Sequence, residues 1–519
     1  MKKTRALFTL LSVVTAVLCV AFCGVFASAD GGEYINPYVA AETEGERKLS
    51  EIELSEPVVM HVEELDLYAS ASADALAETS IDQSLADYLA AGCEAGLEEV
   101  PLYTEGYRVP VADLKSLIMY MKYDHPELFY LANSFKYSSM DEYVYSYYPV
   151  YMYSSAEMAA AKQEFNALLD ALMAHAPRFA TDFEELLYYH DYIVANFEYD
   201  TDYQIYDAYN MLKQRKGVCQ AYTMLYASIL DRLGIENTAA LSDGMNHVWN
   251  VVLLDGEWFF TDLTWDDPIA DVKGRVFHTH FLRSAEYFTS DGYYGWRFVD
   301  GEERELSDKY ADMFYYEVYQ VVHIWKGGLF YFDYKDCFMK RIDSVTGECE
   351  PLFYVDTRTY IQGTASYYDC RSTGFCGYAD KLYYGAQNGR TGTFSIYEYN
   401  VDTGEKKTLY TFECKQGTAE SVYKMFVWEN TVYYLRSDDP YDTGSGTIDT
   451  FEVEKYAGSA PVLMDINGDG EITNIDLVML VRYLSGWDVD GFAAECADAN
   501  SDNKINNRDA IAIIRHLAA

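Results

Sequence analysis

The feature that most constrains the fold is the Asp255-Gly256 dipeptide between the two apolar runs of "HVWNVVLLDGEWFFTDLTW". An Asp-Gly pair in this setting is a strong signal for a β-hairpin with a two-residue turn. Such a turn pairs Leu254 with Glu257, Val251 with Phe260, Trp249 with Asp262 and His247 with Thr264. Opposed side chains share a face of the sheet, so His247 and Asp262 become diagonal neighbours on one face, about 7–8 Å apart at Cα.

The stretch "GVCQAYTMLYASILDRLG", residues 217–234, predicts a helix with Cys219 in its first turn and Gly234 just past its end. Unsatisfied N–H groups and the positive dipole end favour a thiolate there. Alone, Cys219 is more often a small buried hydrophobe, and His247 beside a tryptophan more often fills a strand face. Together with Asp262 they provide a nucleophile, a base and an orienting carboxylate, and the nearby backbone N–H groups provide an oxyanion site. The combination predicts acyl transfer.

Three stretches carry a family resemblance: "KGVCQAYTMLYASILDRLGI", "MNHVWNVVLLDGEWFFTDLTWDDP" and "HDYIVANFEYD". They resemble the transglutaminase-like domain of exported bacterial proteins over about residues 100–285, and "HPELFYL" is typical of its clostridial members. The resemblance implies a papain-like core with the nucleophile at Cys219, the base at His247 and the orienting group at Asp262. Gln220 stands where many members have glycine, and Gln214 is a candidate for an oxyanion side chain.

Three of the histidines outside this triad fall in motifs of their own. His190 with Asp191 falls in a helical stripe, which favours a structural or supporting role. His278 and His280 alternate in "FHTHF", but the local sequence offers no carboxylate or cysteine to complete a metal site. We therefore expect "FHTHF" to be a surface strand.

The N-terminus has the pattern of a secretory signal peptide over residues 1–29. Lys2, Lys3 and Arg5 precede an apolar run over residues 6–26, and "ASAD" follows as a cleavage site. An uncleaved anchor is the alternative, because about 20 apolar residues can span a bilayer. Cleavage leaves a secreted protein with no membrane insertion. Export permits disulfides, whose connectivity stays open, and a reducing setting would leave the thiols free.

The formal net charge is −44 at pH 7. A chain this acidic repels both nucleic acid and anionic lipid, which excludes them as partners.

The length of 519 residues indicates two to four domains, in a multidomain α+β protein. A leader over 30–60 precedes a helical lead-in and the transglutaminase-like domain over 61–295, where Ser154 and Glu157 form a capping box. Residues 296–456 are β-rich, with loose repeats starting at Leu329, Leu382 and Val432. This blade-like spacing fits a propeller-like domain, and a β-sandwich is the alternative. A linker over 457–461 leads to a small module over 462–519.

Two twelve-residue loops in that module, "DINGDGEITNID" and "DANSDNKINNRD", have the ligand spacing of calcium loops. Each is followed by an apolar helix, with Asp rather than Glu at the last loop position. The first loop places oxygen ligands at Asp465, Asn467, Asp469, Glu471 (through its carbonyl), Thr473 and Asp476. The second places them at Asp498, Asn500, Asp502, Lys504 (through its carbonyl), Asn506 and Asp509.

This paired arrangement resembles an all-α type I dockerin. The resemblance implies two structural Ca²⁺ ions and docking to a cohesin domain of a scaffoldin. Its contact residues fall at Asn474, Ile475, Asn507 and Arg508.

Two functions follow as hypotheses. The first is a secreted cysteine enzyme acting on a protein or peptide substrate, more a peptidase or amidase than a cross-linking transglutaminase. Its dockerin would recruit it to a cellulosome-like complex at the cell surface. The alternative is a non-catalytic, scaffold-docked binding protein whose β-rich domain recognises a protein or carbohydrate target.

Overall fold

The structure is a computed structural model of the 519-residue chain. It describes residues 34–35, 59–60, 62–66, 82–173, 176–177, 179–267, 269, 274–369, 374–428, 430–438, 446–454, 464, 466–467, 472–487, 489, 492, 494–497, 505–506, 510–511, 513–514 and 517. The predicted signal peptide and linker, and nearly all of the predicted leader, lie outside these residues. No helix among the described residues is long and apolar enough to span a bilayer.

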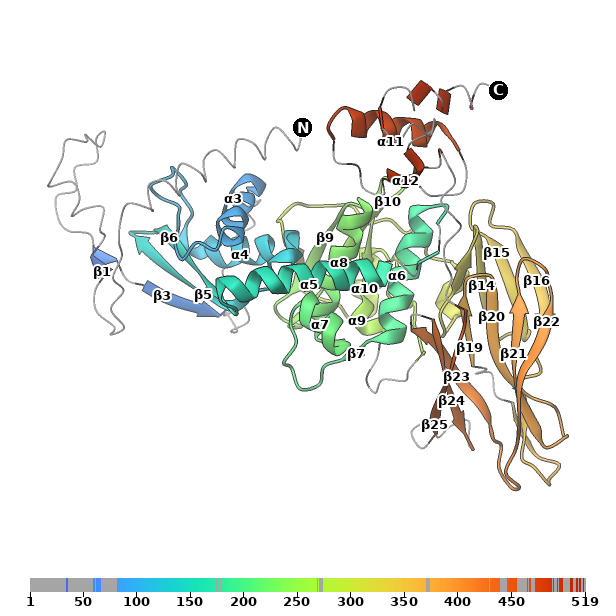
Figure 1. Ribbon diagram of the computed structural model, residues 1–519. Helices are drawn as coiled ribbons and strands as arrows, with labels where there is room; N and C mark the ends of the chain where they lie inside the picture. Colours follow the sequence, from blue (N-terminus) through green and yellow to red (C-terminus); the bar gives the residue numbers. More distant parts are fainter. Residues whose placement is uncertain are drawn as a thin grey trace. The chain divides into compact units, whose positions relative to one another are not determined.

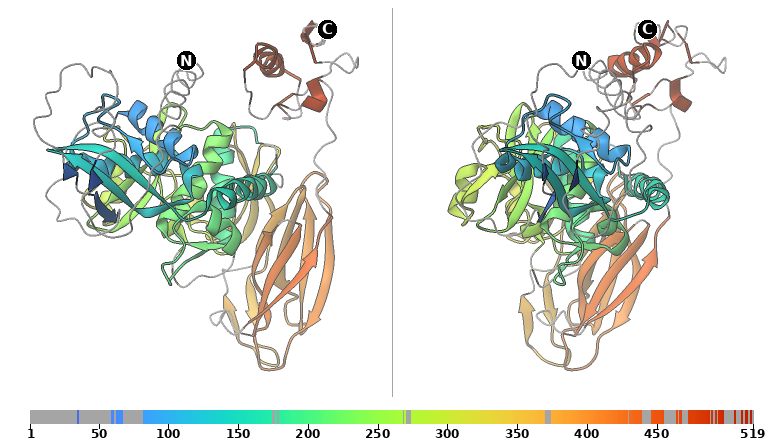
Figure 2. Two further views of the ribbon diagram at one scale, coloured as in Figure 1. Left: turned by 60° about the vertical axis from the view of Figure 1, so that its left-hand side comes forward. Right: turned by 90° about the vertical axis from the view of Figure 1, so that its left-hand side faces the viewer.

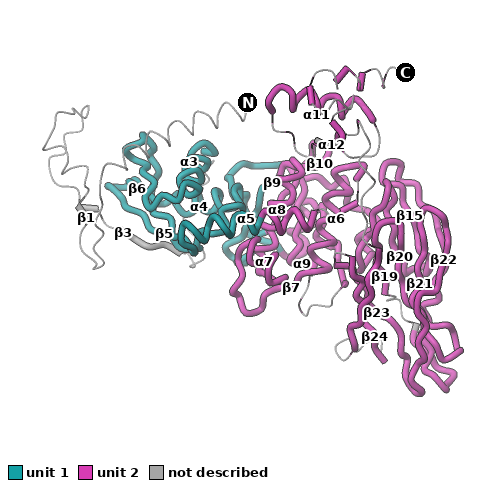
Figure 3. The backbone as a smooth tube through the Cα atoms, viewed as in Figure 1, with its two compact units in different colours: residues 1–165, 238–248, 293–304 teal, residues 166–237, 249–292, 305–519 magenta. Residues whose placement is uncertain are grey.

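The chain mixes helices and sheets, which confirms the predicted α+β class, and it divides into two compact units (Figure 3). The first comprises residues 1–165, 238–248 and 293–304, and the second 166–237, 249–292 and 305–519. The domain boundaries drawn from the sequence stay predictions.

The first unit combines helices with a four-stranded sheet of order β3-β5-β6-β4. The strands are β3 (Val62–Asp66), β5 (Leu131–Met140), β6 (Tyr143–Tyr151) and β4 (Val100–Pro101), and the helices are α3 (Gln83–Glu94), α4 (Val111–Asp124) and the 3₁₀ turn η1 (Pro126–Leu128). Two short strands, β1 (Tyr34–Ile35) and β2 (Val59–Met60), pair with each other. Strand β9 (Asn237–Ser242) pairs with β12 (Trp296–Phe298).

Helix α5 (Ser155–Met173) begins with the predicted capping box. The backbone N–H of Ser154 donates to Glu157 Oε2 at 2.8 Å, and the N–H of Glu157 donates to Ser154 Oγ at 3.4 Å. Two N–H groups that the helix itself leaves unsatisfied are thereby bonded.

The second unit contains the helices and the hairpin of the candidate site (Figure 1). They are α6 (Asp182–Asn196), α7 (Ala208–Gln214), α8 (Cys219–Leu233), α9 (Leu263–Asp266), α10 (Ala285–Ser290), β7 (Glu198–Tyr199), β8 (Lys216–Gly217), β11 (Glu257–Thr261) and the part of β10 (His247–Leu254) from Trp249 onward. Helix α9 packs against α6 and α8. Gly234 ends α8 with a φ of 75°, as predicted for a C′ glycine.

The hairpin register is confirmed as far as β11 extends. Leu254 pairs with Glu257, Val251 with Phe260, and Asn250 with Thr261. Asp255 and Gly256 have φ values of 54° and 81°, which the two-residue turn requires. The expected pairings of Trp249 with Asp262 and of His247 with Thr264 are wrong, because β11 ends at Thr261, Asp262 caps α9 and Thr264 lies in α9.

The β-rich region contains three successive antiparallel meanders (Figures 1 and 2). The first comprises β13 (His323–Trp325), β14 (Gly328–Asp333), β15 (Phe338–Asp343) and β16 (Cys349–Tyr354). The second comprises β19 (Phe375–Tyr378), β20 (Lys381–Gln387), β21 (Thr393–Asn400) and β22 (Lys406–Glu413). The third comprises β23 (Ser421–Trp428), β24 (Thr431–Ser437) and β25 (Thr447–Glu452). The turn η2 (Phe314–Glu317) precedes them, and β17 (Arg358–Tyr360) with β18 (Tyr367–Asp369) form a two-stranded sheet.

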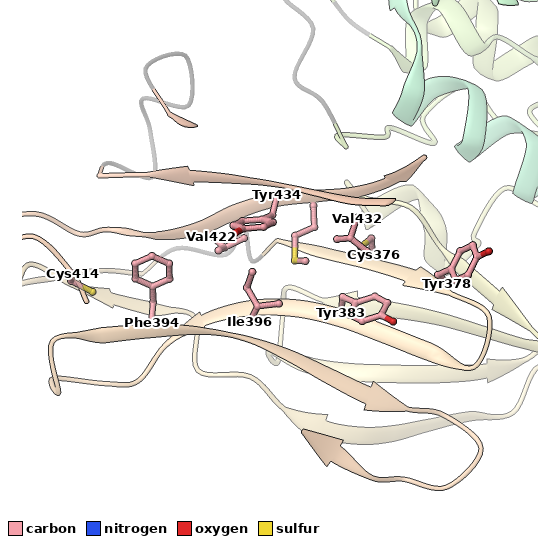
Figure 4. Close-up of a cluster of buried hydrophobic side chains, with 10 residues drawn as sticks. Cys376, Tyr378, Tyr383, Phe394, Ile396, Cys414, Val422, Val432 and Tyr434 are labelled. Atoms are coloured by element: carbon pink, nitrogen blue, oxygen red, sulfur yellow. The ribbon is translucent and has the colours of Figure 1, made fainter. Parts of the chain in front are cut away.

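The predicted repeat starts occupy equivalent places in these meanders. Leu329, Leu382 and Val432 each lie in the second strand, paired with Ile324, Gly377 and Val427 of the first strand. A buried cluster that includes Phe394, Ile396 and Val432 joins the second and third meanders (Figure 4). A second cluster joins the first meander to the second. Among the described residues the meanders thus form an open stack of blade-like sheets.

The first strands of this stack lie against α6. Helix α6 contacts both β13 and β23, and the ring of Tyr192 stacks on that of Trp428 with centroids 5.6 Å apart. The guanidinium of Arg215 lies 3.8 Å from the centre of the same indole ring. A cavity of about 60 Å³ remains between α6 and the first strands. The innermost strands are therefore buried by the helical layer rather than by a closed ring of blades.

The C-terminal module contains α11 (Asn474–Leu484) and α12 (Ala494–Ala497). Helix α11 includes the apolar segment predicted to follow the first loop. Ile466, Leu480, Ala497 and Ile513 form its small buried core.

Candidate active site

Cys219 is the first residue of α8 and is half-buried. Gly217 lets the chain approach α8 closely, since a Cβ on Gly217 would lie 2.6 Å from the Cβ of Ala221. The short parallel pair β7-β8 places Tyr199 beside Gly217. The thiol is thus presented at a helix start, where backbone N–H groups have no partner within the helix.

Tyr199 is a neighbour of this thiol that the sequence alone did not identify. Burial raises the pKa of the Tyr199 phenol, and the nearby Cys219 raises it further. The phenol therefore keeps its proton and offers an O–H donor beside the nucleophile. Gln214, the upstream candidate from the sequence, is the exposed last residue of α7. The only signal for Tyr199 was its place in "FEYD".

Asp262 is 1% exposed and caps the N-terminus of α9. Its Oδ1 accepts hydrogen bonds from the backbone N–H of Thr264 at 3.0 Å and of Trp265 at 3.2 Å. Its own N–H donates to the carbonyl oxygen of His280 at 3.0 Å. These bonds hold Oδ1 of the carboxylate and the backbone of Asp262 in place.

His247 is the first residue of β10 and is half-buried. Its ring lies 6.1 Å from that of Tyr293, centroid to centroid. His247 belongs to the first compact unit, whereas Cys219 and Asp262 belong to the second. Assembly of the three side chains into a triad stays a prediction.

Asp262 adjoins a buried histidine network through His280. The network is made of His190, Asp191, Asp266, His278 and His280. All five are at most 5% exposed. Burial alone lowers the pKa of His190, but hydrogen bonds to Asp191 and Asp266 outweigh it and raise that pKa to about 9. Burial likewise lowers the pKa of His280, but the hydrogen bond to Asp266 outweighs burial and raises that pKa to about 9.

This network corrects the prediction of a surface strand at "FHTHF". His278 and His280 are 1% and 5% exposed and lie in no strand. The missing carboxylates come from elsewhere in the chain, with His278 bonded to Asp191 and His280 bonded to Asp266. Local sequence could not show these partners, because α6 and α9 bring them in.

In the first calcium loop, Asp476 is fully buried. Its Oδ1 accepts from the N–H groups of Ile466 at 2.7 Å and Asn467 at 3.0 Å, and its Oδ2 accepts from that of Thr473 at 2.7 Å. The last loop position thus joins the start of the loop to α11. The loop's side chains are the oxygen donors that Ca²⁺ prefers. The residues present therefore fit a calcium site.

The other predicted ligands are described in part. Asn467, Thr473 and Asn506 are described, whereas Asp465, Asp469, Glu471, Asp498, Asn500, Asp502, Lys504 and Asp509 lie outside the described residues. Of the predicted partner contacts, Asn474 and Ile475 open α11, and Ile475 is 57% exposed. Asn507 and Arg508 lie outside the described residues.

Two family models match the chain. Residues 174–263 match the transglutaminase-like superfamily, and residues 463–518 match the dockerin type I domain. The chain therefore carries a transglutaminase-like core and a C-terminal type I dockerin, as the resemblances implied. The matched core includes Cys219, His247 and Asp262. Type I dockerins generally bind calcium, and the domain implies binding to a cohesin.

Individual relatives are distant. The chain is 24% identical over 155 residues to the kyphoscoliosis peptidase of Mus musculus, covering 26% of this chain and 23% of that protein. It thus spans less than a quarter of this curated relative. A solved structure of a proposed cysteine protease from Cytophaga hutchinsonii has 20% identity and a TM-score of 0.16, covering 20% of this chain and 36% of the other. The crystal structure of a TGase has 14% identity and a TM-score of 0.19, covering 31% and 48%.

Proposed function

We propose that this protein is a secreted cysteine enzyme that cleaves peptide or isopeptide bonds with a Cys219–His247–Asp262 triad. The observation that carries the proposal is the pairing of two features in one unit. Cys219 opens α8, and the buried Asp262 is held rigidly at the start of α9, which packs on α8. The third member, His247, is the first residue of β10, whose hairpin leads through β11 to Asp262.

In this mechanism the Cys219 Sγ attacks the amide carbonyl carbon while His247 accepts the thiol proton. His247 then donates that proton to the leaving amine as the C–N bond breaks, which leaves a thioester on Cys219. Water attacks the thioester carbon and His247 takes the water proton. As the C–S bond breaks and the acid is released, His247 returns that proton to the Cys219 sulfur. Asp262 orients the imidazole and stabilises its charged form. Backbone N–H groups near Cys219 bind the oxyanion.

We favour hydrolysis over cross-linking because water greatly exceeds any amine in concentration. A cross-linking enzyme must bind an amine and exclude water from the thioester. The acceptor for the acyl group is therefore water.

The dockerin supplies the place of action. We propose that the two loops of residues 465–476 and 498–509 bind two Ca²⁺ ions that stabilise the module. The folded module would then dock to a cohesin of a scaffoldin through Asn474, Ile475, Asn507 and Arg508. This recruits the enzyme to a cell-surface complex of the cellulosome type.

Thiol alkylation tests the triad, and the chain contains its own reference thiol. Cys349 is exposed on β16, so iodoacetamide labelling followed by peptide mapping compares the two cysteines in one sample. We expect Cys219 to react at neutral pH about tenfold faster than Cys349 and to lose that advantage in His247→Ala. Equal rates for the two thiols, or no effect of His247→Ala, would show that Cys219 is not activated and would favour a binding role.

A further inference from the structure

Hydrogen bonds from the buried histidine network hold both ends of α9, the helix that Asp262 caps. Helix α9 has only four residues, too few to be stable by itself. At its C-terminal end, Asp266 Oδ2 accepts from His190 Nε2 at 3.1 Å, and its Oδ1 accepts from His280 Nδ1 at 3.1 Å. At its N-terminal end, Asp262 donates to the carbonyl oxygen of His280 at 3.0 Å. The orientation of Asp262 therefore depends on His190 and His280.

The same network continues to the β-rich stack. Asp191 Oδ1 accepts from His190 Nδ1 at 2.9 Å and from His278 Nε2 at 2.8 Å. Asp191 Oδ2 accepts from the N–H of Val322 at 2.6 Å, and His278 Nδ1 donates to the carbonyl oxygen of Val318 at 3.0 Å. Val318 and Val322 lead directly into β13. One continuous path of hydrogen bonds thus runs from the first blade to the support of Asp262.

Every ring nitrogen along this path has a hydrogen-bond acceptor beside it. Each ring nitrogen of His190, His278 and His280 faces a carboxylate or carbonyl oxygen, which only accepts hydrogen bonds. The rings of His190 and His280 are therefore doubly protonated, in agreement with their raised pKa values. Their two positive charges are matched by the carboxylates of Asp191 and Asp266, and His280 Nε2 also bonds to Asp291 at 2.8 Å. This matching makes the burial of so many charges tolerable.

A bound metal ion is the alternative explanation for the cluster of His190, Asp191 and His278, because their ligand atoms lie close together. A divalent ion would have to displace the protons on His190 Nδ1 and His278 Nε2. Both nitrogens lie 2.8–2.9 Å from Asp191 Oδ1, which is the length of a charged hydrogen bond. Ligands about 2.0–2.2 Å from a tetrahedral zinc lie roughly 3.3 Å apart. The nitrogen–oxygen distances in this cluster therefore favour shared protons over a bound metal ion.

We propose that this network positions Asp262 for catalysis and that seating of the first blade on α6 completes it. The inference rests on the proposed function of Cys219, His247 and Asp262. His190, Asp191, Asp266, His278 and His280 act as positioning residues, and the β-rich stack thereby becomes a structural part of the catalytic core.

The test measures Cys219 alkylation against pH in the full-length protein. Asp266→Asn disrupts the hydrogen bonds to His190 and His280 next to Asp262. Asp191→Asn disrupts the hydrogen bonds to His278 and Val322 that lead to the β-rich stack. Neither change alters the size of the side chain. We expect Cys219 to react about tenfold more slowly at neutral pH in Asp266→Asn, with a pH profile moved toward that of His247→Ala. Asp191→Asn should shift the profile the same way, by about threefold. Labelling of Cys349 should not change.

Glu420→Gln is the matched control, because Glu420 is a buried carboxylate in the same unit that binds the N–H of Lys415. It should leave the Cys219 profile unchanged. His278→Gln keeps a donor for Asp191 but loses the bond to Val318, and it serves as a second test if either Asn variant does not fold. Circular dichroism establishes folding for each variant.

The outcomes separate the two proposals. If wild-type Cys219 shows no advantage that depends on His247, the proposed function fails and the positioning role fails with it. If wild-type Cys219 is activated but folded Asp266→Asn, Asp191→Asn and His278→Gln keep its profile, only the positioning role is overturned. A metal bound one to one in the purified protein, and lost in Asp191→Asn, would also overturn it by making these residues ligands.

Discussion

Asn250 of β10 donates a hydrogen bond of 3.0 Å from its Nδ2 to the carbonyl oxygen of Thr223 in α8. The amide is 1% exposed, so no solvent replaces this bond. It ties the predicted hairpin to the helix that begins with Cys219. This buried side chain therefore contributes to the relative placement of the nucleophile and the hairpin.

Loss of this bond should affect both stability and the thiol. We expect Asn250→Ala to lower the free energy of unfolding by about 1–3 kcal/mol, measured by denaturant titration, and to slow Cys219 alkylation. Asn388→Ala is the control, since Asn388 bonds to Thr393 and Ser395 within the β-rich stack. It should lower stability without changing Cys219. An equal effect of both variants on alkylation would contradict the link between β10 and α8.

Asp262 has two separable roles, as helix cap and as carboxylate. Asparagine caps a helix about as well as aspartate, so Asp262→Asn should keep the stability of α9. It removes the negative charge, and amide hydrolysis should fall by about 10²–10⁴-fold. Asp262→Ala should lose both properties, with a further cost of about 1 kcal/mol in the free energy of unfolding. Near-normal turnover by Asp262→Asn would remove Asp262 from the triad.

The buried histidine network should make stability depend on pH in a defined direction. The pKa values of His190 and His280 are raised to about 9, from 6.5 when unfolded. Their contribution is fully present below about pH 6.5 and is lost as the pH rises through about 9. The pKa values of Asp191 and Asp266 are lowered from 3.8, so their contribution is present above that value and is lost as the pH falls through the folded-state pKa.

Unfolding titrations from pH 3 to 10 should therefore show a plateau between about pH 4 and 6.5 and a decline toward pH 9. In His280→Gln the alkaline decline should be shallower. If the free energy of unfolding of His280→Gln falls toward pH 9 as steeply as that of the wild type, other groups cause the decline.

Calcium removal should affect the dockerin and spare the thiol. We expect chelation by EGTA to lower helical content and to abolish binding to a cohesin, with no change in Cys219 alkylation. Asp476→Ala removes the carboxylate that binds Ile466, Asn467 and Thr473, and should weaken calcium binding about tenfold or more in calorimetry. Ser485→Ala, at the C-terminal end of α11, is a control within the same module. Two Ca²⁺ ions bound by Asp476→Ala with unchanged affinity would exclude Asp476 as a calcium ligand.

Several features were determined by the sequence alone because their causes are local. The Asp255-Gly256 turn sets the hairpin register, Ser154 and Glu157 cap α5, and Gly234 ends α8. The repeat starts found from the sequence occupy equivalent strands, since each follows its own tight turn. The motifs around Cys219 also identified the transglutaminase-like core.

Only the tertiary structure decided what surrounds those features. The sequence placed His278 and His280 on a surface, whereas packing buries them against Asp191 and Asp266. Strand β11 stops before Thr264 because Asp262 caps a helix instead of continuing the ladder. Tyr199 lies beside Cys219 through a strand pairing of two residues. Turns and caps depend on neighbours within a few residues, whereas the burial of a charge depends on which distant elements pack against it, and no local pattern encodes that.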